Sequence, residues 1–366
     1  MRILALVTDA FGGRGGIAKF NRDLLNAFCA DPSVEEVVAL PRLMPEPPGP
    51  LPLRLKYVTG IPAGKLGYFL GALLAVWKNP RFDVILCGHI YLLPLAALAR
   101  KWAPRSRLIL MMHGIEAWQR PHVPFLEECL SRVDAFAAVS EFTKNKFLSW
   151  ADAADRRWFL LPNSVDLERF HPGPKNEALL ERYGLAGKKV LLTVARLSAQ
   201  EQYKGVDEVL EVLPGLLKES PQAAYLIVGR GTDRRRLEAK AASLDIRDRV
   251  VFAGYVSEDE KADHYRLADC FVMPSRGEGF GIVFLEALAC GIPVIGSSED
   301  AAGEVLRGGL GILVDPQNPG EIKKAVLQAL QNPREDVREK LSFYAFSEFV
   351  RRTQQMLAAV LHLKRT

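Results

Sequence analysis

The chain has 366 residues, of which 49% are hydrophobic and 25% are charged, and its formal net charge is +5. This length predicts two domains, each large enough for its own core, and the composition is typical of a globular protein rather than a disordered or fibrous one. The five cysteines form no C-x-x-C pair, so they offer no metal-ligand spacing and fit a reducing compartment. We therefore expect a cytoplasmic protein.

The first residues, MRILALVTDA, enter an apolar run with no basic region before it and no cleavage site. This start predicts a first strand rather than a signal peptide. The longest apolar stretch, Val84 to Ala99, contains His89 and Pro94 and is shorter than the roughly 18–20 residues that span a bilayer. No transmembrane helix is expected.

A glycine-rich loop, FGGRGGIAKF, follows the first expected strand from Phe11 to Phe20. Glycines let the backbone approach a ligand, and the next helix directs its N-terminus to the same place. Gly13-x-Gly15-x-x-Ala18 fits only a relaxed dinucleotide fingerprint, because no acid ends the second strand. The pattern favours a ligand-facing loop over an ordinary tight turn and disfavours a nicotinamide oxidoreductase.

Short apolar runs alternate with helical patterns in both halves of the chain. We expect strands in the first half at 3–8, 37–40, 84–87, 108–112, 135–139 and 158–161. In the second half we expect them at 189–194, 224–228, 250–253, 270–273, 293–296 and 312–314. Such alternation predicts parallel sheets with helices on both faces, and therefore two doubly wound α/β domains.

The turn-rich segment PNSVDLERFHPGP, 162–174, marks the expected domain boundary. We expect an N-terminal domain at 1–165 and a C-terminal domain at 166–344. A long helix is expected over Phe343–Lys364. We expect the C-terminal segment 345–366 to pack back on the first domain.

Residues 50–110 contain nine bases and one acid. Such a one-sided block favours an anionic partner, such as phospholipid, a lipid diphosphate or nucleic acid, although a solvated basic face with no partner explains it equally well. Within it, the apolar segment Gly67–Lys78 ends in Trp77 and Lys78, a combination that suits a membrane interface. An ordinary core helix is the alternative.

Polar residues follow several expected strands, at the sheet edge where open α/β folds bind ligands. His113 precedes Gly114 at the end of one strand, and a structural histidine is the alternative. Arg196 and Lys204 follow another strand and could neutralise a diphosphate, although surface bases are common. Gly229 and Gly231 end the next strand and suit a further ligand-lining loop.

The segment 274–293, PSRGEGFGIVFLEALACGIP, carries the strongest functional signal. Glu278 lies in a loop bracketed by glycines, and Glu286 lies about two turns into the apolar helix that we expect next. The loop and the helix N-terminus offer N–H groups to an anion, and a buried carboxylate needs donors such as hydroxyl groups. The segment predicts a nucleotide-sugar site. The alternative is a core helix whose glutamate is satisfied by a protein donor.

The chain contains no Asp-x-Asp pair, no G-x-S-x-G and no G-x-x-x-x-G-K-[ST] motif. We therefore expect no metal and no other cofactor. Fixed charges and dipoles would then have to stabilise a leaving diphosphate.

Taken in order, these segments resemble the retaining glycosyltransferases of family 4 over essentially the whole chain. The resemblance rests on Gly12–Gly16, His113-Gly114-x-Glu116, PNSVDLERF at 162–170, Arg196 with Lys204-Gly205, VGRG at 228–231 and Glu278-x7-Glu286. It implies the GT-B fold, in which two Rossmann-like domains face a central cleft. It also implies that the N-terminal domain at 1–165 binds the acceptor and that the C-terminal domain at 166–344 binds the donor. The stretch between Arg196 and Lys204 is longer than is common in the family.

The resemblance also implies roles for single residues. Arg196 and Lys204 would bind the donor diphosphate, Glu286 the ribose hydroxyls and Glu278 a hydroxyl of the donor sugar. The residues expected to act in catalysis are His113, Arg196, Lys204 and Glu278. Further donor contacts are expected at Gly15, Gly16, Gly229, Tyr255, Val256, Gly279, Phe280, Gly281 and Ile282.

The implied reaction is metal-independent transfer of a hexose, with retention, from a UDP- or GDP-hexose to a glycan or lipid-linked acceptor. Its expected setting is lipopolysaccharide or exopolysaccharide synthesis at the inner face of the cell membrane, without nucleic acid. A nucleotide-sugar epimerase of the same fold and a non-catalytic nucleotide-sugar-binding subunit are the alternatives. The sequence leaves the base, the sugar, the acceptor and the oligomeric state open.

Overall fold

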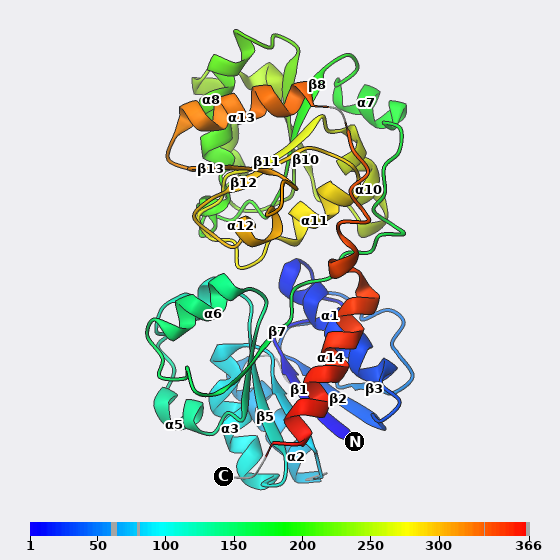
Figure 1. Cartoon of the computed structure of the whole chain (residues 1–366), viewed down its shortest axis with the longest axis vertical. Helices are drawn as coiled ribbons and strands as arrows, with labels where there is room; N and C mark the ends of the chain where they lie inside the picture. Colours follow the sequence, from blue (N-terminus) through cyan, green and yellow to red (C-terminus); the bar gives the residue numbers. More distant parts are fainter. Residues whose placement is uncertain (60–63, 79–80, 333, 364–366) are drawn as a thin grey trace. The chain divides into compact units, whose positions relative to one another are not determined.

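The structure, a computed structural model, describes residues 1–59, 64–78, 81–332 and 334–363. The chain divides into two compact units (Figure 1). Unit 1 comprises Met1–Ser164 and Phe346–Thr366, and unit 2 comprises Val165–Ala345. Within the described ranges, no helix combines the length and the apolarity that crossing a bilayer requires.

Unit 1 is built on a seven-stranded sheet in the order β3-β2-β1-β4-β5-β6-β7, and all its strand pairs are parallel. The strands are β1 (Arg2–Val7), β2 (Glu36–Pro41), β3 (Leu55–Tyr57), β4 (Val84–Cys87), β5 (Arg107–Met112), β6 (Ala135–Ala138) and β7 (Arg157–Leu160). The helices are α1 (Gly16–Ala30), α2 (Lys65–Lys78), α3 (Leu93–Trp102), α4 (Ile115–Trp118), α5 (Leu126–Ser131), α6 (Glu141–Leu148) and α14 (Phe346–Leu361).

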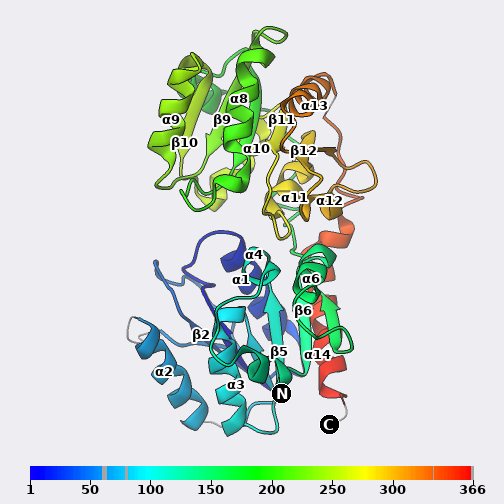
Figure 2. The same ribbon diagram turned by 90° about the vertical axis from the view of Figure 1, so that its left-hand side faces the viewer.

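Both faces of the unit 1 sheet are covered. Side chains of α2, α3, α5 and α6 form one hydrophobic core with β1, β2, β4, β5 and β6, whereas α1 and α14 pack together on the other face (Figure 2). Burial on both faces explains why strands such as RILALV and RLILMM are apolar almost throughout instead of alternating.

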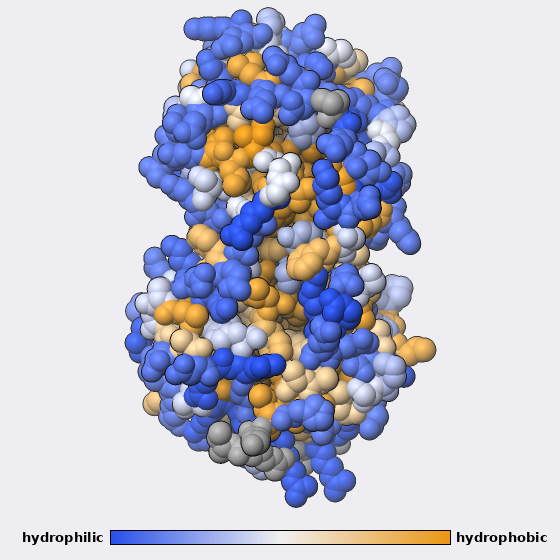
Figure 3. Space-filling model, in the orientation of Figure 1, coloured by the Kyte–Doolittle hydropathy of each residue, from blue (hydrophilic) through white to orange (hydrophobic). Residues whose placement is uncertain are grey.

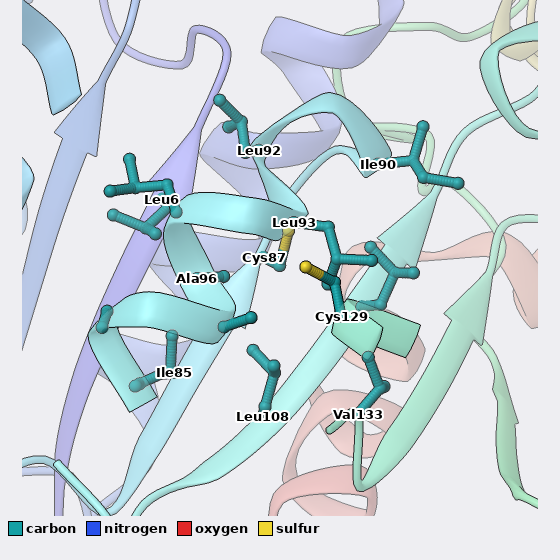
Figure 4. Packing of buried hydrophobic residues seen from close by; sticks show 14 of the residues in the cluster. Leu6, Ile85, Cys87, Ile90, Leu92, Leu93, Ala96, Leu108, Cys129 and Val133 are labelled. Atoms are coloured by element: carbon teal, nitrogen blue, oxygen red, sulfur yellow. The ribbon is translucent and has the colours of Figure 1, made fainter. Parts of the chain in front are cut away.

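Figures 3 and 4 contrast the surface with this core. Hydrophilic side chains predominate on the face drawn in Figure 3, with apolar groups between them. In Figure 4, residues of α3 and the neighbouring α5 segment lie over sheet residues that include Leu6, Ile85, Cys87 and Leu108. Burial raises the pKa of Cys87 to about 12, so its thiol stays protonated and packs as a small apolar group.

Unit 2 is built on a six-stranded parallel sheet in the order β10-β9-β8-β11-β12-β13. The strands are β8 (Lys189–Val194), β9 (Ala223–Val228), β10 (Val250–Gly254), β11 (Cys270–Met273), β12 (Val294–Ser297) and β13 (Ile312–Val314). The helices are α7 (Glu177–Tyr183), α8 (Val206–Leu217), α9 (Arg234–Ser243), α10 (Glu258–Leu267), α11 (Ile282–Ala289), α12 (Ala302–Val305) and α13 (Pro319–Gln331).

The core of unit 2 also has two halves. Helices α8, α9 and α13 pack on one face of the sheet. On the other face the ring of Phe271 on β11 lies between Tyr265 of α10 and Phe284 of α11, with ring centroids 5.9 and 5.7 Å apart. Helices α10 and α11 are therefore fixed to the same strand.

The predicted pair of doubly wound α/β domains is confirmed, and every expected strand is present. Strand β3 was not predicted from the sequence, because three residues are too few for a periodic pattern and only pairing with β2 makes them a strand. The final helix begins at Phe346 and not at Phe343, because residues 342–344 form a 3₁₀ turn. The last residues of the segment 345–366 lie outside the described ranges.

Candidate functional site

The strand order of unit 2 reverses between β8 and β11. The chain runs from β8 outward through β9 to β10, and from β11 in the opposite direction through β12 to β13. In open α/β sheets, ligands bind at such a reversal, beyond the carboxyl ends of the two strands. The loops at that place, 195–205 and 274–281, contain Arg196, Lys204 and Glu278.

The structure brings Lys204 and Glu278 together. The Lys204 Nζ donates a hydrogen bond to Glu278 Oε1, and the two side chains are 17% and 12% exposed. Burial disfavours the lysine charge, but the adjacent carboxylate more than offsets this, so the pKa of Lys204 is raised. A cation and an anion are thus held side by side at the strand-order reversal.

The two loops that carry this pair are also joined through their main chains. The Arg276 N–H donates to the Tyr203 carbonyl oxygen at 2.8 Å. Gly205 adopts φ 82°, and a Cβ there would lie 2.6 Å from the carbonyl oxygen of Pro274. Only glycine permits this approach, so Gly205 fixes the distance between the loops.

Arg196 lies outside the Lys204–Glu278 pair. Its side chain is 68% exposed, and its Nη2 lies 2.5 Å from Glu201 Oε1. The guanidinium is therefore held on the loop after β8 with most of its surface open to solvent. The structure does not bring Arg196 into contact with Glu278.

Glu286 is fully buried and is held by two donors from α10. Its carboxylate accepts from Lys261 Nζ at 2.9 and 2.7 Å and from the Tyr265 hydroxyl at 2.8 Å. It is thus satisfied by protein donors, the alternative raised from the sequence. It is the fifth residue of α11, so our placement two turns into the helix was wrong; it lies about one turn in.

The sequence did not predict Lys261 and Tyr265 as partners of Glu286. They lie four residues apart on one side of α10, whose sequence EDEKADHYRL is polar and is typical of a solvent-exposed helix. Burial disfavours the charge of Lys261, but Glu286 more than compensates, and the pKa of the lysine is raised. Only the packing of α10 against α11 reveals these partners.

The segment 279–282 forms the N-terminus of α11. Gly279, Phe280, Gly281 and Ile282 are all buried. Gly281 adopts φ 86°, and a Cβ there would lie 2.4 Å from the Phe284 ring. The glycine therefore lets the loop turn sharply into the helix, whose first N–H groups lack acceptors within the helix.

Gly229, Tyr255 and Val256 lie at the ends of the neighbouring strands β9 and β10. Gly229 donates its N–H to the Gly254 carbonyl at 2.8 Å, and a Cβ there would lie 1.8 Å from the Ala195 carbonyl oxygen. Gly229 is therefore required for the packing of these loops. Tyr255 is 48% exposed, and the Arg230 guanidinium lies 5.1 Å from its ring centroid.

In unit 1 the strand order reverses between β1 and β4, and the glycine loop follows β1. A Cβ at Gly12 would lie 2.1 Å from the Glu46 carbonyl oxygen, whereas a Cβ at Gly15 or Gly16 would meet nothing within 4 Å. Gly12 thus serves packing of the loop. Gly15 and Gly16, which we predicted near the ligand, border open space.

His113 follows β5 in unit 1. Its Nε2 lies 2.9 Å from the Gly88 carbonyl oxygen, which can only accept, so Nε2 carries the hydrogen and Nδ1 is left as an acceptor. Burial lowers the pKa of His113, so the imidazole is neutral at pH 7. Glu116 Oε1 accepts from the N–H groups of His113 and Gly114 at 2.5 and 3.1 Å and fixes the turn.

Two family profiles match this chain. The one described as Glycosyltransferase Family 4 matches residues 14–169, and the one described as Glycosyl transferases group 1 matches residues 176–347. The first match covers most of the N-terminal segment of unit 1, Met1–Ser164, and the second covers most of unit 2, Val165–Ala345.

Two curated relatives and one solved structure illustrate the similarity. The chain is 36% identical over 254 residues to a GDP-mannose-dependent alpha-(1-6)-phosphatidylinositol monomannoside mannosyltransferase of Mycolicibacterium smegmatis, covering 66% of this chain and 65% of the relative. It is 34% identical over 215 residues to a D-inositol 3-phosphate glycosyltransferase of Geodermatophilus obscurus, covering 56% of this chain and 47% of the relative. The matched part is thus just under two thirds of the first relative's length.

The solved structure of the Anabaena protein HepE in complex with UDP and glucose superposes with a TM-score of 0.75 at 19% identity, covering 98% of this chain and 100% of that one. At this identity the likeness concerns the fold. The expected GT-B fold, with its two Rossmann-like domains, is confirmed.

Proposed function

We propose that this chain, which belongs to glycosyltransferase family 4, transfers a hexose from a nucleoside-diphosphate sugar to a glycolipid or glycan acceptor. The observation that carries the proposal is the Lys204–Glu278 pair at the strand-order reversal of unit 2. An ammonium suits a diphosphate, and a carboxylate beside it suits a sugar hydroxyl.

In this proposal, different residues of unit 2 bind different parts of the donor. Lys204 and Arg196 stabilise the charge that grows on the leaving diphosphate. Glu278 accepts a hydrogen bond from the donor sugar. Glu286 accepts from ribose hydroxyls, since a carboxylate has about four acceptor positions and its protein donors fill only some of them. Gly229, Tyr255, Val256 and the segment 279–282 contribute main-chain contacts.

We propose that transfer occurs with retention and without metal. The acceptor hydroxyl attacks the donor sugar from the same face from which the diphosphate leaves, and the leaving phosphate takes the proton of the acceptor hydroxyl. Glu278 and Glu286 are each engaged by a lysine, which supports a binding role over a nucleophilic one. We also propose that Nδ1 of His113, a neutral acceptor, binds a hydroxyl of the donor sugar. Activity should persist in EDTA; loss that Mg²⁺ or Mn²⁺ restores would contradict this proposal.

GDP-mannose is the first donor to test, because the name of the Mycolicibacterium smegmatis relative contains it. The same name points to an inositol-containing lipid as a first acceptor. A role in lipopolysaccharide or exopolysaccharide synthesis stays a prediction, as does a cytoplasmic location, which the five free cysteines support.

The test is a thermal-shift screen with GDP, UDP, ADP and their sugars, followed by a transfer assay with the donor that binds. A ligand at 100 times its Kd should stabilise the chain by about 2.7 kcal/mol. No stabilisation by any nucleotide or sugar nucleotide would refute the proposal. Conversion of the donor to an epimer without an acceptor would favour an epimerase, and binding without turnover a non-catalytic subunit.

We also propose that unit 1 attaches to an anionic membrane surface through α2, which lies next to α3 (Figure 2). Leu66, Leu70, Leu74 and Trp77 share one side of this helix and are 71%, 51%, 53% and 70% exposed. The opposite side is buried, so the helix is both a core helix and an exposed apolar surface.

The basic block around α2 is smaller than the sequence suggested. Arg54 donates to main-chain oxygens, and Arg100 and Arg107 pair with Asp134. The exposed bases outside the helix are Arg54, Lys56, Arg81, Lys101 and Arg105. Each can add on the order of 1 kcal/mol at an anionic surface, less at high salt.

Vesicle sedimentation tests the attachment. Wild type should bind anionic but not neutral vesicles at low salt, and Leu70→Glu should abolish binding. Leu313→Glu, which replaces an exposed leucine of unit 2, should have no effect. Equal and negligible binding of wild type to both vesicle types would refute attachment.

A further inference from the structure

Asp300 is a buried carboxylate in the loop after β12. It is 3% exposed, and three donors surround it. Its Oδ2 accepts from the Ser275 hydroxyl at 2.6 Å and from the Glu278 N–H at 2.9 Å, and its Oδ1 accepts from the Ala302 N–H at 3.0 Å. One acid of the β12 loop therefore binds the β11 loop and its own short helix at once.

A second bond ties the same two loops. The Ala301 N–H donates to the Glu278 carbonyl oxygen at 3.1 Å. Both main-chain polar groups of Glu278 are thus bonded to the segment 300–301, while its side chain reaches Lys204. The position from which the Glu278 carboxylate projects is set by this contact.

The chemistry of the contact requires a carboxylate. All three groups around Asp300 donate, and only an ionised carboxyl accepts at both oxygens; an asparagine presents an NH₂ to one of the donors. Burial raises the pKa of Asp300 to about 6, although the Ser275 hydroxyl and the N–H groups of Glu278 and Ala302 oppose this. At pH 7.5 the group is therefore ionised and accepts all three bonds.

We propose that Asp300 is a positioning residue that holds Glu278 in the place from which its carboxylate binds a hydroxyl of the donor sugar. This rests on the proposed role of Glu278. If Asp300 only capped α12, Oδ1 would suffice; the bonds of Oδ2 are made to the Glu278 loop alone. Asp300 then acts on sugar recognition and not on recognition of the nucleotide.

Isothermal titration of four variants with GDP-mannose and GDP, and with UDP-glucose and UDP, tests the proposal. Asp300→Asn should weaken the sugar nucleotide that wild type binds by about 10-fold and should leave the free nucleotide within about 2-fold. In a Glu278→Gln background, Asp300→Asn should cause no further loss, because the residue through which it acts is already altered. Ser275→Ala, which removes one donor, should give a smaller sugar-specific loss.

The outcomes separate the two proposals. A loss that is equal for free nucleotide, or that persists in the Glu278→Gln background, would overturn the role of Asp300 alone. Absence of a sugar-specific loss in Glu278→Gln itself would overturn the proposed role of Glu278 and this one with it. Asp269→Asn is the matched control: its carboxylate accepts from the Val190 N–H at 2.7 Å at the amino end of the sheet, and it should affect neither ligand selectively.

Discussion

Glu278→Gln is the most informative single change, because Glu278 neutralises the lysine that should bind the donor diphosphate. Lys204 donates a hydrogen bond to the Glu278 carboxylate. Glutamine keeps the shape and one acceptor oxygen but removes the negative charge. We expect the variant to lose affinity for the sugar nucleotide and to keep, or gain, affinity for the free nucleoside diphosphate.

The size of each effect follows from the contacts. A charge-assisted hydrogen bond to a sugar hydroxyl contributes roughly 1.5–3 kcal/mol, which predicts a loss of about 10- to 100-fold for the intact donor. A carboxylate charge about 6 Å from a bound diphosphate weakens its binding by about 3 kcal/mol at an effective dielectric constant of about 20. Because Glu278 and Lys204 are 12% and 17% exposed, solvent screens part of this. We expect a gain of about 3- to 10-fold for the free nucleotide.

Titration of wild type and variant with GDP and GDP-mannose measures both changes in affinity, the loss for the intact donor and the gain for the free nucleotide. Glu238→Gln is a suitable control, since it removes the carboxylate of the Arg234–Glu238 pair on α9 and should change neither affinity. If Glu278→Gln weakens GDP as strongly as GDP-mannose, Glu278 does not distinguish the sugar from the nucleotide and the assignment is wrong.

Four further outcomes are expected. Glu286→Gln should weaken donor and free nucleotide alike by about 10- to 100-fold in titrations. It should also lower the melting temperature, because Lys261 loses its nearer anion and keeps only Glu258, at 4.0 Å. Arg196→Ala should lower kcat more than it raises KM in a transfer assay, because leaving-group charge grows in the transition state. In urea unfolding, the stability of wild type relative to Asp300→Asn should fall by up to about 3 kcal/mol as pH rises from 4 to 7. The sign follows because the folded chain keeps this carboxyl protonated up to about pH 6, whereas the unfolded chain ionises it near 3.8. A deoxy donor that lacks the hydroxyl read by Glu278 should bind only about 10-fold more weakly, because that carboxylate keeps its lysine partner; a loss above about 1,000-fold would show an unpaired carboxylate.

The sequence predicted the sheets and the loops of the candidate site for a physical reason. A parallel strand buried on both faces needs a continuous apolar run, and the polar residues that end each run lie at one edge. Arg196, Lys204 and Glu278 are of this kind. Strand β3 has only three residues, LKY, with one exposed, so its pattern carries no such signal.

The partners of the two glutamates could not be predicted in the same way. Lys261 and Tyr265 lie on a helix whose polar sequence is compatible with full exposure, and only contact with α11 buries them. Asp300 lies in a loop, SSEDAAG, with no periodic pattern. A pairing between segments distant in sequence depends on tertiary packing, and local sequence patterns carry no information about it.

The two lysine–glutamate pairs, Lys204–Glu278 and Lys261–Glu286, affect the free energy expected for donor binding. Glu278 and Glu286 are not unsatisfied carboxylates that await a ligand, because each already holds a lysine ammonium. In the proposed donor complex, a sugar or ribose hydroxyl would share a carboxylate with the lysine that already binds it, so the net gain would be smaller than the value of an isolated hydrogen bond. Each glutamate therefore belongs to an ion pair and is not an unpaired buried charge. The selectivity of the site must then come from the fixed positions of these carboxylates, which depend on the contacts made by α10 and by the loop of Asp300.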